Sequence, residues 1–262
     1  MASAADDEWT SVPSRKGKKT RSSQVPHPSH GLANAPPPVS RDLTISDIKR
    51  DFETKLKQWR KTECRKQLLK LVDWVMDARG PGKLEKFVCL GSGSLSRDNV
   101  ECRRRSLWQI VVFWDLVEYV RGQQEQGEEE EDGDSGRGEV RASDPAYTEL
   151  DAEFFKTLGI EDVDFDRNAK GLGKVREYLG EGTLLFEPFV DMNVDMMRDL
   201  AEKDAGIYVG SSVGGLQKRG GELGELAKKF GSDRTMRKFP VFEVDPNVFD
   251  GIEIYWKEES DD

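Results

Sequence analysis

The sequence reads Phe87-Val88-Cys89-Leu90-Gly91-Ser92-Gly93-Ser94-Leu95-Ser96 at the place that decides its fold. An uninterrupted run of four apolar residues that ends at a glycine is typical of a buried parallel strand. The two glycines, two positions apart, allow a sharp turn and the close approach of a bound group. An apolar helical pattern follows from Leu107 to Val120, with Asp98 or Asn99 as its candidate N-cap. This order of strand, glycine turn and helix predicts a Rossmann-like unit, although Ser96 stands where the dinucleotide fingerprint has its third glycine.

Strand and helix patterns alternate along the rest of the chain. One long amphipathic helix is predicted to begin at a cap formed by Thr44 or Ser46, to continue through Val75 and to stop at Gly80. Further strands are predicted at 140–143, 160–165, 183–186, 206–209 and 248–256, the last at a sheet edge, and further helices at 149–158, 193–202 and 222–230, with a short helix or loop at 171–179. The prediction is an α/β fold, Rossmann-like and three-layered, with a mostly parallel sheet and helices on both faces.

The composition divides the chain into a domain and polar segments. Only 36% of the residues are apolar and 34% are charged, so part of the chain cannot bury a core. We predict a disordered basic tail over residues 1–42, the Rossmann-like domain over 43–257, an acidic disordered insertion inside it at 122–139, and an acidic tail at 258–262. The basic cluster at 15–21 is open to two interpretations, a nuclear-import or nucleic-acid contact and a solvated tail, of which we favour the tail.

Charge, hydropathy and residue counts exclude several classes of protein. The formal net charge of −10 argues against a general nucleic-acid-binding protein. No apolar run approaches the roughly 20 residues of a membrane span, and the N-terminus lacks the apolar core of a signal peptide, so we expect an intracellular protein. Cys64, Cys89 and Cys102 form no Cys-x-x-Cys pair, which predicts neither a disulfide framework nor a zinc site. The only histidines, His27 and His30, lie in the tail, which excludes a histidine base inside the domain.

Polar residues follow several of the predicted strands, and ligands bind beyond the carboxyl ends of the strands in an open parallel sheet. Asp144 stands where a Rossmann site holds a ribose, but Asp-Pro also commonly caps a turn. Glu187 is a candidate base or a plain turn residue, and no histidine is present to activate Ser211 or Ser212. Arg103 to Arg105, at the predicted helix start, would bind phosphate or form a solvated basic turn. The candidate ligand-binding residues are Gly91, Ser92, Gly93, Ser94, Asp144, Glu187, Ser211 and Ser212, with no metal ligand and no catalytic residue predicted.

Several short motifs follow one another in a fixed order. They are 88–96, Ser106 with Gln109, 144–147, 158–160, 183–189, 208–212 and 249–256, together with Glu8-Trp9 ahead of the basic run. This ordered set resembles the sensitivity-to-red-light-reduced family, known as the SRR-like domain, over roughly residues 45 to 256. Many relatives carry a Pro-His-Cys-like segment after the fourth strand. This chain has Pro188-Phe189-Val190 there, so a metal or acid–base role of that segment is not expected.

The resemblance implies a Rossmann-like domain found in cytoplasmic and nuclear proteins, so we expect this protein in the cytoplasm, in the nucleus or in both. The family is linked to circadian timing and light signalling in plants and to haem biosynthesis and cytoskeletal stability in fungi, and we expect a fungal-type member. Our first hypothesis is a non-catalytic regulatory or interaction protein that binds an unidentified protein partner, and neither a membrane nor nucleic acid. The second is an enzyme that uses a nucleotide or S-adenosylmethionine as its cofactor, bound at the turn from Gly91 to Ser96, which rests on analogy of fold.

Overall fold

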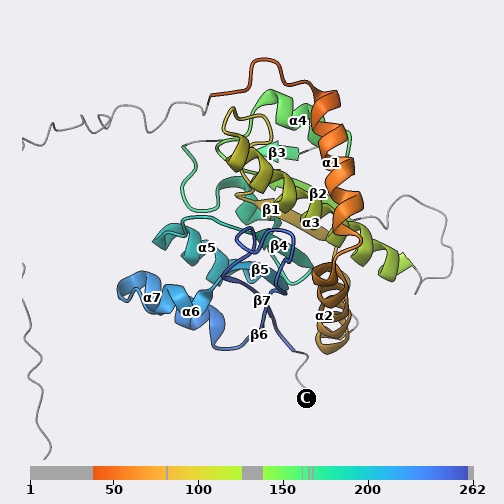
Figure 1. Ribbon diagram of the computed structural model, residues 1–262. Helices are drawn as coiled ribbons and strands as arrows, with labels where there is room; N and C mark the ends of the chain where they lie inside the picture. Colours follow the sequence, from red (N-terminus) through yellow and green to blue (C-terminus); the bar gives the residue numbers. More distant parts are fainter. Residues whose placement is uncertain are drawn as a thin grey trace, which may run out of the picture. The chain divides into compact units, whose positions relative to one another are not determined.

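Within the described residues, seven strands form one sheet in the computed structural model (Figure 1). The structure describes residues 38–80, 82–125, 138–160, 162–164, 166 and 168–258. The order across the sheet is β3-β2-β1-β4-β5-β7-β6; the first five strands of the chain run parallel, and β7 is antiparallel to β5 and β6. The strands are β1 (Lys86–Leu90), β2 (Glu139–Ser143), β3 (Asp162–Asp164), β4 (Thr183–Glu187), β5 (Ile207–Ser211), β6 (Thr235–Lys238) and β7 (Ile252–Trp256).

Helices cover both faces of the sheet (Figure 1). The first four helices share one apolar core with the sheet, and the later ones share a second core on the opposite face. The first group is α1 (Ile45–Trp59), α2 (Glu63–Arg79), α3 (Val100–Glu125) and α4 (Glu149–Lys156); the second is the 3-10 helix η2 (Gly173–Tyr178) with α5 (Val194–Lys203), α6 (Val213–Gln217) and α7 (Gly221–Gly231). The three-layer, mostly parallel α/β fold predicted from the sequence is confirmed.

The strand β1 shows why its sequence is apolar without interruption. Phe87 and Cys89 face the core formed with α1 to α4, whereas Val88 and Leu90 face the core formed with η2 and α5 to α7. All four side chains are buried. Because successive residues of a strand point to opposite faces, a central strand covered on both sides has no position left for a polar residue.

The N-terminal helical region is two helices, so the prediction of one long helix was wrong. Thr44 caps α1, where its side chain accepts the N–H of Asp47 and the Asp47 carboxylate accepts the N–H of Thr44. Thr62 forms a second cap, accepting the N–H of Arg65, and thereby starts α2 in a new direction. The buried carboxylate of Asp115 on α3 accepts hydrogen bonds from Trp59 and from Arg65, which ties both helices to the same layer.

The helix α3 is longer than the predicted 107–120. Its start is set by Asn99, whose side chain accepts the N–H of Cys102, so that the arginines predicted at the helix start lie within the helix. Arg104 pairs with Glu101 and with Asp245, and therefore its charge is balanced within the chain. Residues 122–125 of the predicted acidic insertion continue α3, residue 138 leads into β2, and residue 139 is the first residue of that strand.

The C-terminal part of the sheet also differs from the prediction. The strand β7 lies between β5 and β6 rather than at the edge, and it begins at Ile252 because Phe249 to Gly251 form a turn, with φ of 79° at Gly251. The strand at this edge of the sheet is β6, which the sequence analysis missed. Its exposed, charged side chains at Arg237 and Lys238 hide the alternation of a half-buried strand, and such charges are typical of edge strands.

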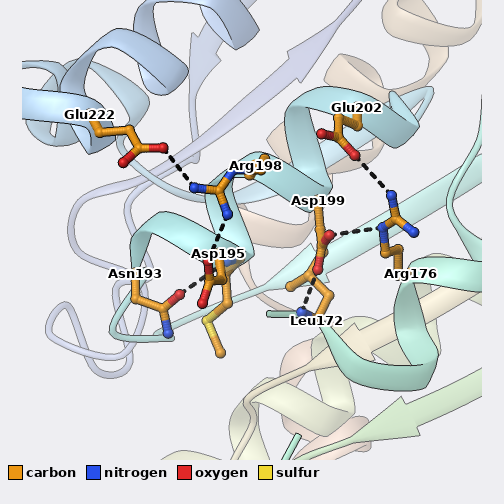
Figure 2. A network of polar contacts seen from close by, with 9 residues as sticks. Leu172, Arg176, Asn193, Asp195, Arg198, Asp199, Glu202 and Glu222 are labelled. Atoms are coloured by element: carbon orange, nitrogen blue, oxygen red, sulfur yellow. Dashed lines mark hydrogen bonds and ion pairs between the residues drawn. The ribbon is translucent and has the colours of Figure 1, made fainter. Parts of the chain in front are cut away.

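The helix α5 is fastened to its neighbours by a surface network of charged side chains (Figure 2). Asp199 accepts the N–H of Leu172 at 2.9 Å and pairs with Arg176, which links α5 to η2. Arg198 pairs with Asp195 on its own helix and with Glu222 on α7, at 2.6 Å in both cases. These contacts fix the layer that covers β4 and β5 on one side.

Residues 1–37 of the predicted basic tail, which include its cluster at 15–21, and most of the acidic insertion lie outside the described residues. Residues 38–42 are described, and there the N–H of Ser40 donates to the carbonyl of Ser96 at 2.9 Å. The acidic residues from 259 onward lie outside them as well. In the part of the chain that is described, no helix is both long enough and apolar enough to cross a membrane.

Candidate functional site

The topological switch point of the sheet lies between β1 and β4. These strands are neighbours, and the chain proceeds from β1 to β2 on one side and from β4 to β5 on the other. In open α/β sheets this is the place where a crevice forms and ligands bind. The predicted site residues lie around it, since Gly91 to Ser94 follow β1, Asp144 follows β2, Glu187 ends β4 and Ser211 ends β5.

Asp144 holds the glycine turn in place. One carboxylate oxygen accepts the N–H of Gly93 at 2.6 Å, and the other accepts the N–H of Ala146 at 2.7 Å. Gly91 and Gly93 both have positive φ angles, 76° and 74°, which glycine adopts without strain. Burial raises the pKa of Asp144, while the hydrogen bonds from Ala146 and Gly93 and the positive charge of Arg97 act against that rise.

The serines of the turn bond to α4 and to the loop before it. The hydroxyls of Ser92 and Tyr147 are 2.6 Å apart, and those of Ser94 and Ser96 are 3.0 Å apart. Asp151 accepts the N–H of Leu95 at 3.0 Å and the hydroxyl of Ser96 at 3.3 Å. The sequence analysis did not single out Tyr147 or Asp151, although a threonine three residues before Asp151 is the signature of a capping box.

Glu187 organises the other side of the switch point. Its carboxylate accepts the hydroxyl of Tyr208 at 2.5 Å, the N–H of Ser211 at 3.1 Å and the hydroxyl of Ser211 at 3.3 Å, and it also accepts the N–H of Val190. Burial raises the pKa of Glu187, and burial together with the nearby Glu187 charge raises that of Tyr208. Tyr208 lies in one of the sequence motifs but was not predicted as a site residue.

The loop after β4 closes on the glycine turn. A β-carbon built on Gly91 would lie 2.2 Å from Cγ2 of Val190, so the space that the glycine leaves is filled by that valine. Glu187 holds Val190 in this position through its backbone N–H. A β-carbon on Gly93 would lie 2.5 Å from the hydroxyl of Ser106 on α3. Both glycines are therefore needed for close contacts within the chain.

Arg97 is a residue near the turn that the sequence analysis did not consider. Its Nη2 atom is 4.0 Å from the position of a β-carbon on Gly93, and its charge acts on Asp144. A guanidinium group beside a glycine turn is suited to contact a negatively charged ligand. Nothing in the sequence distinguishes Arg97, which precedes α3, from the arginines at 103–105, which lie in that helix.

Ser212 is separated from the other candidates by its role as the cap of α6, where its hydroxyl accepts the N–H of Gly215 at 3.2 Å. It lines a pocket of 570 Å³ that is otherwise formed by residues 238–253, between β6 and the start of β7. The structure thus brings Gly93 to Asp144, and Gly91 and Ser211 to the loop held by Glu187, but it places Ser212 in a different pocket.

One comparison with known proteins identifies a family. The family model described as the SRR1 domain matches residues 52–256, which is most of the chain and includes every residue of the switch point described above. No protein with a curated description matches the chain.

Proposed function

This chain belongs to the SRR1 domain family, and we propose that it is a non-catalytic regulatory protein, cytoplasmic or nuclear, that acts by binding a protein partner. The observation that carries this proposal is the closure of the switch point, where Val190 fills the space beside Gly91. In open α/β sheets that bind small molecules, this crevice receives the ligand. In this chain the side chain of Val190 occupies the space beside Gly91.

The use of the carboxylates supports the same proposal. A general base needs a carboxylate within reach of a substrate proton. Asp144 is occupied by two backbone N–H groups, and Glu187 by Tyr208, Ser211 and Val190. The four hydrogen bonds to Glu187 leave its carboxylate little acceptor capacity for a substrate, and the two to Asp144 use about half of its acceptor sites.

The loop that closes the switch point offers an apolar contact to a partner. Phe189 precedes Val190 in the loop, and its side chain is 43% exposed. Aromatic side chains are enriched in protein–protein interfaces, where they bury a large apolar area. Because Glu187 and Val190 fix the loop, Phe189 would be presented in one position.

The experiment is cross-linking of the full chain in cells, followed by mass spectrometry of the captured proteins. We expect Phe189→Asp to lose a set of partners that the wild type captures. Val100→Asp is the matched control, because Val100 is also an exposed apolar residue but lies at the start of α3. Circular dichroism of both variants checks that they fold. The same captured proteins in all three samples would contradict this use of Phe189.

The alternative function is an enzyme that uses a nucleotide or S-adenosylmethionine, and the position of Arg97 beside Gly93 favours it. Such a ligand would require Val190 to move away from Gly91. Calorimetric titration of the wild type with nucleotides and with S-adenosylmethionine tests this alternative directly. If Asp144 holds a ribose, Asp144→Ala weakens binding by roughly ten- to a hundred-fold. Binding heat in the wild type that Asp144→Ala removes would favour the enzyme over the interaction protein.

A further inference from the structure

A second pocket lies at the other end of the strands from the switch point, at the edge of the sheet where the parallel strands begin. It has a volume of 530 Å³ and is bordered by the residues just before β1, β4, β5 and β6, by the end of α2 and by the residues just after β7. Two arginines, Arg79 from the end of α2 and Arg234 from the start of β6, line it. None of the residues assigned to the switch point takes part in this pocket.

Arg234 is held in the pocket wall by contacts that leave part of its guanidinium group unused. Its side chain is only 1% exposed and stacks on the ring of Phe230 at 4.3 Å. Nη2 donates to the carbonyl of Ala205 at 2.7 Å and to the carboxylate of Asp204. Its Nε and Nη1 atoms are buried and find no acceptor among the described residues.

Arg79 shows the same division of its donors. Nη2 donates to the carbonyl of Glu181 at 2.7 Å, but Nη1 is buried and has no hydrogen-bond partner in the part of the chain that the structure describes. Gly206 makes room for this arrangement, because a β-carbon there would lie 1.8 Å from the carbonyl oxygen of Glu181 and 2.8 Å from Nη2 of Arg79. The guanidinium group is therefore fixed before any ligand arrives.

Unpaired N–H donors and positive charges that lie close together would both be stabilised by a bound anion. Buried N–H groups normally have hydrogen-bond partners, and an unpaired one lowers stability. Burial lowers the pKa of Arg79, the charge of Glu181 raises it and the charge of Arg234 lowers it, so that Arg79 has both a carboxylate and a second cation nearby. An oxyanion between them would accept the unused donors and screen the repulsion, and guanidinium groups are the preferred partners of phosphate and carboxylate.

We propose that the pocket between Arg79 and Arg234 binds a small phosphate, either inorganic phosphate or a phosphate monoester. Three donor nitrogens are unused, and the three or four oxygens of a phosphate match them better than the two of a carboxylate.

The other charges of the pocket limit what it accepts. Asp204 is shared by Arg234 and Lys257, and Glu85, Glu181 and Glu258 also line the pocket. Positive and negative side chains are therefore both present, and binding depends on the oriented donors rather than on a surplus of positive charge. These carboxylates would repel a polyphosphate or a nucleic acid more strongly than a single phosphate group.

The test is calorimetric titration of the full chain at low ionic strength with inorganic phosphate and, separately, with phenyl phosphate. We expect saturable binding of one or both to the wild type, and the stronger of the two identifies the kind of phosphate. Arg79→Gln removes the unused donors of one arginine and should weaken binding by about tenfold or more. Arg198→Gln is the matched control, because Arg198 is an exposed arginine whose donors pair with Asp195 and Glu222 (Figure 2), and it should bind as the wild type does.

A second measurement keeps the proposal testable if Arg79→Gln does not fold. Hydrogen exchange of the wild type, with and without phosphate, should show slower exchange in segments 204–207 and 234–237, which carry the pocket wall. Unchanged exchange in both segments, or equal phosphate binding by Arg79→Gln and the wild type, would overturn the proposal. An absence of saturable phosphate binding in the wild type would overturn it too. None of these outcomes bears on the partner-binding proposal, which concerns the other edge of the sheet.

Discussion

At the carboxyl edge of the sheet, where the parallel strands end, buried carboxylates accept hydrogen bonds from the chain itself, whereas at the amino edge, where they begin, two guanidinium groups each keep buried donor atoms unused. Glu187 and Asp144 are the buried carboxylates of the carboxyl edge, and Arg79 and Arg234 carry the guanidinium groups of the amino edge. Both regions join loops that leave or enter the same strands. They differ in whether the polar atoms are satisfied within the chain.

The difference separates polar groups that hold a fold together from polar groups that are left for a ligand. A buried group bonded on all sides adds stability, and its removal leaves its former partners unpaired. A buried group that lacks a partner already lowers the stability of the free protein, so that its removal costs little. The two edges should therefore respond to substitution in opposite ways, and this can be measured.

The largest effect is expected for Glu187→Ala. The buried hydroxyl of Tyr208 and the N–H of Ser211 would lose their acceptor, and Val190 would lose the bond that holds it over Gly91. We expect a loss of about 3–5 kcal/mol in the free energy of unfolding, measured by chemical denaturation. Glu222→Ala, which removes an exposed carboxylate paired with Arg198, is the control and should cost less than about 1 kcal/mol. Equal losses in the free energy of unfolding for Glu187→Ala and Glu222→Ala would show that the hydrogen bonds to Glu187 do not stabilise the fold.

A smaller effect is expected for Asp144→Ala. Two hydrogen bonds, from the N–H groups of Gly93 and Ala146, are lost from a charged acceptor. We expect the free energy of unfolding to fall by about 1.5–3 kcal/mol. Asp144→Asn keeps one acceptor oxygen and should recover part of this loss. An unchanged denaturation midpoint in Asp144→Ala would show that the turn does not depend on its carboxylate.

The pH dependence of stability tests the buried carboxylates of the carboxyl edge in a second way. Burial raises the pKa of Glu187 and of Asp144 in the folded protein, so the folded state holds these protons more tightly than the unfolded state does. Their contribution to stability is present at low pH and is lost as the pH rises through the raised pKa values. Denaturation of the wild type and Glu187→Gln at a series of pH values from 4.5, the ordinary pKa of a glutamate side chain, upward measures this contribution for Glu187. The stability of the wild type relative to Glu187→Gln should increase as the pH falls, and a constant difference would contradict the raised pKa of Glu187.

Much of the fold could be predicted from the sequence, because continuous apolar runs such as that of β1 have few alternative structures. The break between α1 and α2 was missed because the apolar stripe continues across it, and only the cap at Thr62 marks the new helix. The strand β6 was missed because its exposed residues show no alternation. Local sequence thus predicts buried elements better than elements at an edge.

The site could be predicted less well, since its residues are distant in the sequence. The sequence placed Gly91, Asp144 and Glu187 at one edge of the sheet, but it offered no means of seeing that Val190 would fill the space beside Gly91. The pocket at the amino edge had no sequence signal at all. Arg79 and Arg234 are 155 positions apart (234 − 79), and neither belongs to a motif.

The smallest effect on stability is expected for Arg79→Gln, and it tests the amino edge against the carboxyl edge most directly. The variant loses the hydrogen bond to the carbonyl of Glu181, worth about 0.5–1.5 kcal/mol, and the attraction to the Glu181 carboxylate, but it also removes a buried unpaired donor and the repulsion with Arg234. We therefore expect a free energy of unfolding within about 1 kcal/mol of the wild type in buffer without phosphate. Phosphate at about ten times its dissociation constant should then stabilise the wild type by about 1.4 kcal/mol and Arg79→Gln by much less. If Arg79→Gln instead cost as much as Glu187→Ala, the arginine would be a structural group like the carboxylates of the opposite edge, and its unused donors would not be evidence of a ligand.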